Sequence, residues 1–315
     1  MVVDNNITEK IEALKKEKNA IILAHYYQTS DIQDIADFIG DSLALSQKAA
    51  ETSADIIVFA GVKFMAETAK ILSPEKKVII PDILAGCSLA DSCTKEDFGK
   101  FIEDNPGRTV ITYVNTTAEI KALSDIACTS SNAKQIVESL PEDEKIIFGP
   151  DRNLGNYIKS LTGRDILVWD GACHVHERFS LEAIINLKNE NEGAKIIAHP
   201  ECEKPVRLAA DYIGSTSGLL SFVKKDPGKV FIVATEPGII YQMKKTEPGK
   251  TFIPAPPKDS TCGCSECNFM KLITLEKIYK SLKFEEPEVT VDPSIIDRAA
   301  VPIRRMLEIS AKLGL

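Results

Sequence analysis

The sequence predicts an α/β protein with three homologous α/β domains, each with a short parallel sheet, arranged around a pseudo-threefold axis. Three observations support this prediction. Strand-like and helix-like segments alternate along the chain, the strand-like segments form three sets of three, and polar residues recur at matching positions in the sets. Such alternation is typical of parallel sheets covered by helices, because a crossover helix joins neighbouring parallel strands.

Short apolar runs rich in β-branched residues are the strand candidates. They cover residues 20–24, 56–60, 78–81, 109–114, 145–148, 166–169, 195–198, 230–234 and 251–254. Helical patterns fill most of the gaps between them. One example is 31–39, where Ile32, Ile35, Ala36 and Ile39 share one face of a helix.

The three sets form an internal repeat. Each first strand ends in a polar residue, an aspartate follows ten or twelve residues later, and a hydroxyl comes five residues after the aspartate. The polar residues are His25, Asn115 and His199, the aspartates Asp37, Asp125 and Asp211, and the hydroxyls Ser42, Ser130 and Thr216. The second strand ends nineteen residues after each hydroxyl. This agreement indicates a repeat of roughly 85–90 residues and predicts domains over 1–106, 107–192 and 193–315, the last including a C-terminal helix.

A cysteine follows the third strand of each set. The first two are Cys87 and Cys173, and the third is one of Cys262, Cys264 and Cys267. Counting from the preceding strand favours Cys262. Helix starts with an N-capping hydroxyl and an early glutamate are predicted at Thr94, Ser180 and Thr274, seven residues after Cys87, Cys173 and Cys267. This downstream spacing agrees in all three copies and favours Cys267.

Three converging cysteines predict a metal centre. Ligand sites lie at the carboxyl ends of parallel strands, so one thiolate from each domain would reach the axis. Structural zinc and iron–sulfur cubanes normally take four protein ligands, and three cysteines would leave one iron open as a Lewis acid. The alternative is that Cys87 and Cys173 are core residues and CGCSEC is a zinc knuckle or redox trio. His174 and His176 could mimic a zinc site, but no fourth ligand at a known spacing supports one.

The other recurring residues predict a site for a small anion. The three hydroxyls precede helical patterns, where free N–H groups favour carboxylate or phosphate, although simple N-capping is the alternative. Residues two apart point to one side of an extended segment, and the pairs suit anion binding and proton transfer. These pairs are His25 with Tyr27, Tyr113 with Asn115, and His199 with Glu201. A single histidine at a strand end is more often a structural hydrogen-bonding group.

Composition excludes several partner classes. The chain has 38 Lys and Arg against 46 Asp and Glu, a net charge of −8, which argues against nucleic acid as the main partner. No apolar run approaches the roughly 20 residues of a membrane span, and the polar start does not resemble a signal peptide. Eight cysteines without a secretory signal then predict reduced thiols or metal ligands in a cytoplasmic protein.

Several unusual segments together resemble the quinolinate synthase family, from about residue 25 to about residue 275. They include AHYYQ, GDS, YVNTTAEIKALSD, CTSSNA, GPDRNLG, WDGACHVH, AHPEC, GSTSG, ATEPG and the CxxM of Cys267 to Met270. The resemblance implies three α/β domains. It also implies condensation of iminoaspartate (iminosuccinate) with dihydroxyacetone phosphate to quinolinate, phosphate and water, which feeds NAD biosynthesis.

The same resemblance implies the site residues. A [4Fe–4S] cluster with one open iron would be held by Cys87, Cys173 and Cys267. The substrate-binding positions would be His25, Ser42, Tyr113, Asn115, Ser130, His199, Glu201 and Thr216. The catalytic candidates would be Tyr27, Tyr113, His199 and Glu201. An aspartate oxidase or dehydrogenase is the expected source of iminoaspartate. The family often has CxxCxxC where this chain has CxCxxC followed by Asn268, a departure that does not support redox pairing of Cys262 with Cys264.

Two other readings compete. A cluster-dependent hydro-lyase for another small diacid predicts the same cysteines but no dependence on a phosphorylated triose. A zinc-binding or redox-sensing protein predicts a colourless protein without turnover. The matched pairs argue against the second reading, because a structural metal site does not need them.

Overall fold

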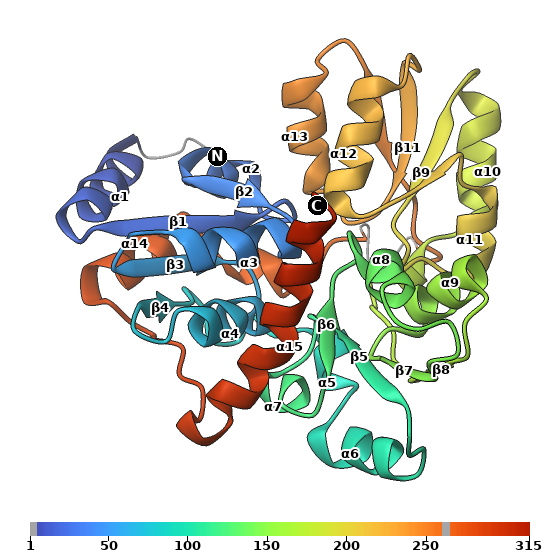
Figure 1. The fold of residues 1–315 in the computed structure, drawn as a ribbon. Helices are drawn as coiled ribbons and strands as arrows, with labels where there is room; N and C mark the ends of the chain where they lie inside the picture. Colours follow the sequence, from blue (N-terminus) through green and yellow to red (C-terminus); the bar gives the residue numbers. More distant parts are fainter. Residues whose placement is uncertain (1–4, 260–264) are drawn as a thin grey trace.

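The computed structural model describes residues 5–259 and 265–315 and confirms the α/β class (Figure 1). The described residues form three four-stranded sheets in which every pairing is parallel. The orders are β2-β1-β3-β4, β6-β5-β7-β8 and β10-β9-β11-β12. The strands are β1 (Ala20–His25), β2 (Phe38–Gly40), β3 (Ile56–Ala60), β4 (Lys77–Ile79), β5 (Thr109–Tyr113), β6 (Ile126–Cys128), β7 (Ile146–Gly149), β8 (Ile166–Val168), β9 (Lys195–Ala198), β10 (Tyr212–Ile213), β11 (Val230–Ala234) and β12 (Thr251–Pro254).

Helices connect and cover the strands. Those of the first repeat are α1 (Asn5–Glu17), α2 (Ser30–Ile35), α3 (Ser42–Glu51), α4 (Lys63–Leu72), α5 (Ser88–Asp91) and α6 (Lys95–Glu103). The second repeat has α7 (Ala118–Lys121), α8 (Ala133–Glu138), α9 (Arg152–Thr162), the 3-10 helix η1 (His176–Arg178) and α10 (Leu181–Glu190). The third has α11 (Lys204–Ala209), α12 (Thr216–Lys225), α13 (Ile239–Thr246), the 3-10 helix η3 (Met270–Leu272) and α14 (Leu275–Phe284), and α15 (Pro293–Lys312) follows.

The repeated aspartates attach a short edge strand to each sheet. The Oδ2 atoms of Asp37, Asp125 and Asp211 accept hydrogen bonds from backbone N–H groups of the first strands, at 2.8, 2.8 and 2.7 Å. The edge strands β2, β6 and β10 follow directly and contain only two or three residues. All three are absent from the sequence prediction because no longer apolar run surrounds them, unlike the runs at 78–81 and 166–169 that predicted β4 and β8.

The first of these edge strands corrects the predicted helix over 31–39. Helix α2 ends at Ile35, and Ile39 belongs to strand β2, where it pairs with Ala24. The spacing of Ile32, Ile35, Ala36 and Ile39 satisfied a helical pattern by coincidence. The side chain and backbone of Asp37 both bond to Ile22 instead, which commits the following residues to the sheet.

The helix after each cysteine packs on the sheet of the next repeat. Phe98 of α6 lies in one apolar cluster with Val110 and Ile147 of the second sheet. Helix α10 packs on β9 and β11, and α14 packs on β3 and α1. The predicted N-caps are confirmed, because Thr94, Ser180 and Thr274 accept backbone N–H groups three residues later at 3.2, 3.2 and 3.3 Å. The three repeats therefore interlock in a cycle, and the boundaries at 106 and 192 stay a prediction.

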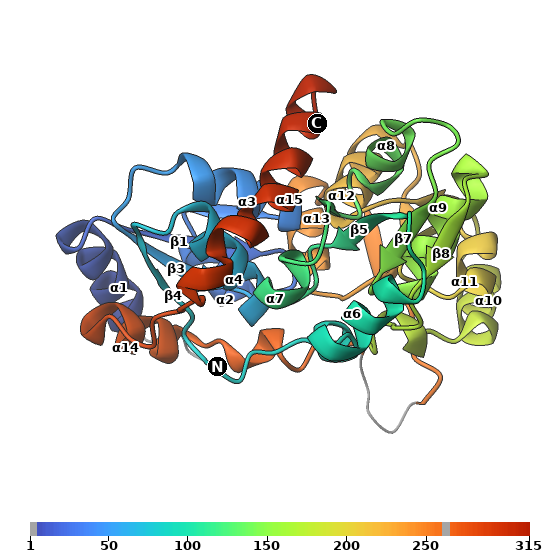
Figure 2. The ribbon, with the colours of Figure 1, turned by 60° about the horizontal axis from the view of Figure 1, so that its bottom comes forward.

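Helix α15 returns across the first two repeats. It contacts α4, α7, α8 and β6, and Figures 1 and 2 both show it crossing between the first two sheets. Its residues Ala299, Ile303 and Met306 are fully buried in the cluster that joins both repeats. The helix predicted together with the third repeat thus packs on the other two.

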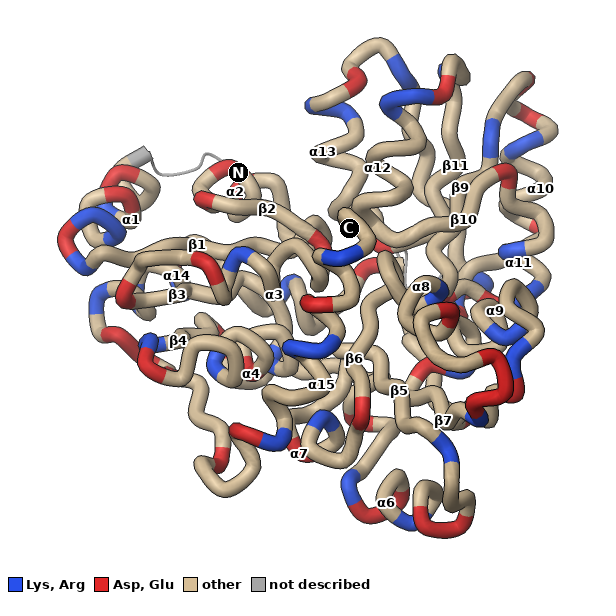
Figure 3. Tube along the Cα trace, viewed as in Figure 1, with Lys and Arg blue, Asp and Glu red and all other residues tan. Residues whose placement is uncertain are grey.

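Charged residues of both signs are interspersed along the outer helices (Figure 3). Within the ranges 5–259 and 265–315, none of the helices combines the length and the apolar character needed to cross a membrane.

Candidate active site

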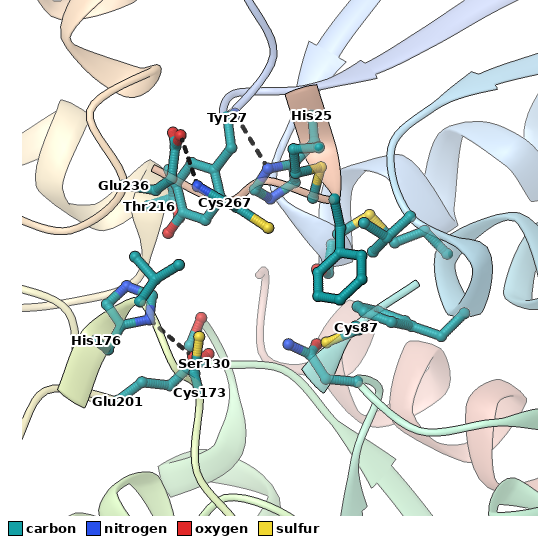
Figure 4. Close-up of a pocket in the computed structure, with 18 of the residues that line it drawn as sticks. His25, Tyr27, Cys87, Ser130, Cys173, His176, Glu201, Thr216, Glu236 and Cys267 are labelled. Carbon is teal, nitrogen blue, oxygen red and sulfur yellow. Dashed lines mark hydrogen bonds and ion pairs between the residues drawn. The ribbon is translucent and has the colours of Figure 1, made fainter. Parts of the chain in front are cut away.

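All the predicted site residues line a single cavity where the three repeats meet (Figure 4). The space between its atoms, including the part open to solvent, is about 670 Å³. It lies at the carboxyl ends of the first strands, since His25 and Tyr113 close β1 and β5 and His199 directly follows β9. The pseudo-threefold arrangement thus brings together residues that lie far apart in the sequence.

Three cysteines, one from each repeat, line this cavity. They are Cys87, Cys173 and Cys267, which follow β4, β8 and β12. The remaining described cysteines (Cys93, Cys128 and Cys202) are free thiols buried in the core and are not part of the cavity. Cys262 and Cys264 lie outside the described residues. The structure therefore separates core cysteines from cavity cysteines, and Cys87 and Cys173 belong to the second group.

The chemistry of these three thiols fits a metal–sulfur centre. Burial raises the pKa of Cys87 to about 12 and also raises the pKa values of Cys173 and Cys267. Thiolates are the ligands of iron–sulfur clusters, and a bound cation would offset the cost of ionising buried thiols. The residues present are therefore suited to a cluster with three cysteine ligands.

The loops after the second strands hold the cysteine loops in place. Lys63 N donates to Ala85 O and Arg152 N donates to Gly171 O, each at 2.7 Å. Both acceptor residues stand two positions before a cavity cysteine. In the third repeat the backbone N–H of Cys267 points instead to Oε1 of Glu236 at 3.4 Å. Glu236 is fully buried and is paired with Lys271 at 2.9 Å. Two repeats thus use a backbone contact where the third uses a buried carboxylate.

The histidines at the strand ends share one local geometry. His25 Nδ1 accepts the N–H of Tyr27 at 3.2 Å, and His199 Nδ1 accepts the N–H of Glu201 at 3.3 Å. Burial lowers the pKa of His25 to about 4 and that of His199 to about 3. Both rings are therefore neutral near pH 7, and the proton must sit on Nε2 because Nδ1 accepts. His199 Nε2 accordingly donates to Ser130 Oγ at 3.2 Å.

Glu201 is a buried carboxylate at the junction of two repeats. Tyr113 Oη donates to its Oε1 at 2.6 Å, and His176 Nδ1 lies 3.0 Å from its Oε2. Burial opposes ionisation, but His176 and the hydrogen bond from Tyr113 outweigh it and lower the pKa of Glu201. Burial and the Glu201 charge raise the pKa of Tyr113 well above 10, so that phenol remains a donor.

Tyr27 is a second, half-buried phenol on the opposite side of the cavity from Glu201 in Figure 4. Its Oη lies 3.1 Å from Thr216 Oγ1 and 2.7 Å from Thr235 Oγ1, both from the third repeat. Burial, reinforced by the charge on Glu201, raises its pKa well above 10. The cavity thus holds a protonated phenol and an ionised carboxylate.

The repeated hydroxyls are not the helix caps. Ser42 and Thr216 are the first residues of α3 and α12, and the capping side chains belong to the residues before them. Asp41 accepts the N–H of Ala44, and Ser215 accepts the N–H of Gly218, each at 3.1 Å. The simple N-cap explanation therefore does not apply to Ser42 or Thr216. The short helix α8 starts later, at Ala133, and Ser130 lies in the turn before it.

Asp41 connects the helix starts of the three repeats. Its Oδ2 accepts from Ser131 Oγ of the second repeat at 2.7 Å and from Ser217 Oγ of the third. Nearby in the cavity, Asn115 Oδ1 is buried without a hydrogen-bond partner among the described residues. The cavity therefore contains an acceptor that is available to a ligand.

Four residues of the site were not assigned from the sequence. They are Asp41, His176, Thr235 and Glu236. Asp41 lies in the GDS segment and Glu236 in ATEPG, so both motifs contained a signal. The roles of His176 and Thr235 depend on contacts between the second and third repeats, and no local pattern encodes those contacts.

Comparison with known proteins agrees with this geometry. The family model described as quinolinate synthetase A protein matches residues 9–308. The chain is 58% identical over 309 residues to the quinolinate synthase of Rippkaea orientalis, covering 98% of this chain and 95% of that protein. It is 60% identical over 300 residues to the quinolinate synthase of Microcystis aeruginosa, covering 95% and 94%. For the quinolinate synthase of Synechocystis sp. the identity is 58% over 300 residues, covering 95% and 94%.

Proposed function

The chain belongs to the quinolinate synthetase A family and is a quinolinate synthase of NAD biosynthesis, and from this premise we propose how the cavity performs the reaction. The substrates are iminoaspartate and dihydroxyacetone phosphate, and the products are quinolinate, phosphate and water. The observation that supports this best is the presence, in one cavity, of one cysteine from each repeat beside a protonated phenol and an ionised carboxylate.

Cys87, Cys173 and Cys267 would hold a [4Fe–4S] cluster. With three protein ligands, the cluster supplies one open iron as a Lewis acid for the hydroxyl that leaves late in the reaction. The cavity provides a reason for three ligands. Among the described residues, no fourth cysteine lines it.

Neutral donors hold the anionic groups of the substrates. The hydroxyls of Ser42 and Thr216 do not cap their helices, and Ser130 lies before the start of α8. His25 and His199 offer Nε2–H donors. Neutral histidines bind a carboxylate or phosphate without a full counter-charge. They therefore allow phosphate to depart once its ester bond breaks. Asn115 Oδ1 accepts from an N–H or hydroxyl of the substrate.

Proton transfer is divided between Tyr27 and Glu201. Near neutral pH the raised pKa keeps Tyr27 protonated and the lowered pKa keeps Glu201 ionised, so the phenol carries a proton that it can give and the carboxylate can accept one. Tyr113 and His199 act beside Glu201, the first through its bond to Oε1 and the second through its ring proton on Nε2. A pair whose pKa values are driven apart is the usual basis for assigning an acid and a base.

The setting follows from the same chemistry. An aspartate oxidase or dehydrogenase would supply iminoaspartate, which is an imine and hydrolyses readily in water. The described cysteines are all free thiols, as in a reducing compartment, and this supports the cytoplasm as the location.

The decisive test is anaerobic purification followed by iron and sulfide analysis and a quinolinate assay. About four irons per chain, together with quinolinate formation that requires both substrates, is the expected result. Cys87→Ser, Cys173→Ser and Cys267→Ser should each lose the cluster and turnover, whereas Cys93→Ser, in the core, should keep both. A colourless protein after anaerobic reconstitution, or full activity in any of the three cavity variants, would refute the proposal.

A further inference from the structure

One group of side chains within the cavity has the composition of a second, smaller metal site. Among the described residues, Cys173, His176 and Glu201 each offer one ligand atom, and these atoms lie within 4.8 Å of one another. Two of the three come from one short segment, since His176 stands three residues after Cys173 at the start of η1. Glu201 comes from the third repeat, so the group exists only in the folded chain.

His176 carries an unused donor atom that is directed toward this group. The ring is 2% exposed, and its Nδ1 has no hydrogen-bond partner in the described part of the chain. That Nδ1 lies 3.0 Å from Oε2 of Glu201, but the two are not aligned as a hydrogen bond. This nitrogen thus has a close contact with the carboxylate but no aligned hydrogen bond, and a metal ion between the two atoms would bind both of them.

The outer contacts of the group are those of metal ligands. His176 Nε2 lies 2.9 Å from Thr235 Oγ1, which fixes the ring orientation and leaves Nδ1 facing Glu201. The other carboxylate oxygen of Glu201 is held by Tyr113 Oη at 2.6 Å. Metal-binding histidines and carboxylates characteristically have their second atom held in this way.

We propose that the cluster-free chain binds a single Zn²⁺ ion through Cys173, His176 and Glu201, and that this ion blocks assembly of the cluster. Sulfur, imidazole and carboxylate ligands in a tetrahedral site, with the fourth position open to water, match the ligand preferences of zinc. The donors of such a site lie about 3.3–3.7 Å apart, given bond lengths of about 2.0–2.3 Å. The imidazole and carboxylate are already closer than this, so the Cys173 thiol must approach by about 1 Å. Its proton is released to water when the ion binds.

The consequence is competition for one ligand. Cys173 cannot serve the zinc ion and the proposed cluster together, and the zinc would also occupy Glu201. Zinc would therefore exclude the cluster and the substrate at once. The inference shares Cys173 with the proposed function, so its test uses variants that separate the two.

The experiment titrates ZnCl₂ into the full-length, cluster-free chain and measures zinc content and affinity against a chromogenic chelator. The expected stoichiometry is one ion per chain. His176→Gln should weaken zinc binding by at least about 100-fold, yet it should still assemble a cluster from iron and sulfide, because the cluster needs only the cysteines. Cys87→Ser should show the reverse, with zinc bound and no cluster. His174→Gln is the matched control, since His174 is held by Ser88 at 2.6 Å and should keep the affinity for zinc.

A second arm measures cluster assembly in the presence of zinc. One equivalent of zinc should lower the iron incorporated by the unmodified chain and should have little effect on His176→Gln. Cobalt(II) provides a probe that requires no variant, because ligation through Cys173 alone predicts the charge-transfer intensity of one cobalt–thiolate bond.

Three results would overturn the proposal. The first is the absence of stoichiometric zinc. The second is unchanged affinity in His176→Gln together with loss of zinc in Cys267→Ser, which would assign the ion to the CGCSEC segment. The third is a cobalt spectrum with the intensity of several thiolates. A failure to bind iron in every variant, with zinc binding as expected, would instead count against the proposed function and leave the zinc site intact.

Discussion

The strand ends of the first and third repeats share one backbone plan but differ in chemistry. In both, a neutral histidine accepts the N–H of the residue two positions later, His25 from Tyr27 and His199 from Glu201. The phenol of Tyr27 then meets two threonine hydroxyls, whereas the carboxylate of Glu201 meets His176 and Tyr113. One repeated loop therefore carries a protonated phenol in one copy and an ionised carboxylate in the other, and the difference comes from the residue at that position together with the partners contributed by neighbouring repeats.

The largest effect is expected from removing the acceptor of the third repeat. Glu201→Gln keeps the shape but loses the charge, and we expect kcat to fall roughly 10²–10⁴-fold. Iron and sulfide contents should remain unchanged, because the proposed ligands of the cluster are cysteines and do not include Glu201. The matched control is Glu203→Gln, whose carboxylate is paired with Lys258 at the surface and should be nearly neutral. Activity of Glu201→Gln within about threefold of the unmodified chain would contradict the assignment of the base.

The neutral histidines predict acid sensitivity of the fold. Burial outweighs the attraction of Asp41 and Glu201, and it holds the pKa of His25 at about 4 and that of His199 at about 3, below the ordinary histidine value of 6.5. Between these values and 6.5 the unfolded chain binds more protons, so stability is present above pH 6.5 and is lost as the pH falls.

Each histidine contributes a slope of about 1.4 kcal/mol per pH unit in that range. Urea unfolding at about pH 7.5 and about pH 5.5 measures it. His25→Gln and His199→Gln should each flatten the dependence, and equal slopes in all three proteins would show that the rings are not buried in the neutral form.

Removing the donor of the first repeat should have a smaller effect than removing the acceptor. Tyr27→Phe deletes the phenolic proton, but the hydroxyls of Thr216 and Thr235 remain in place as alternative donors. We expect kcat to fall about 100-fold, the lower end of the range for a general acid. Tyr26→Phe changes the adjacent phenol, which does not line the cavity, and should be nearly neutral. A larger fall in kcat for Tyr27→Phe than for Glu201→Gln would contradict the expectation that the carboxylate matters more than the phenol.

The smallest expected effect is a difference in stability loss between the edge-strand aspartates of the first and third repeats. Asp37 and Asp211 make the same backbone contact, but Asp37 also pairs at 2.8 Å with Lys15, which is 7% exposed. The partner of Asp211 is Lys188, 35% exposed at 2.9 Å. Asp211→Ala should lower the free energy of unfolding by about 1 kcal/mol, and Asp37→Ala by about 2 kcal/mol, because the buried ammonium of Lys15 then loses one of its two carboxylate partners and keeps only Glu12. Equal losses in thermal or urea unfolding would show that the burial of Lys15 is immaterial.

The repeat could be read from the sequence because each copy keeps polar residues at fixed distances from apolar strands. The caps at Thr94, Ser180 and Thr274 illustrate this well, since capping depends on residues within one turn and all three were predicted correctly. The edge strands were missed for the opposite reason. Each is an apolar segment of two or three residues with no longer apolar run around it, and its position depends on an aspartate that bonds to a strand fifteen residues earlier.

The α/β class, the three repeats and twelve of the residues that line the cavity could be predicted from the sequence, because strand patterns, turn residues and motifs are local properties. Only the tertiary structure decided which residues act on one another. The exchange of α6, α10 and α14 between repeats, the crossing of α15 over the first two sheets, and the contacts of His176 with Glu201 and Thr235 all join residues distant along the chain. Burial at those contacts separates the pKa values of Tyr27 and Glu201, and burial is a property of the assembled fold rather than of any one segment.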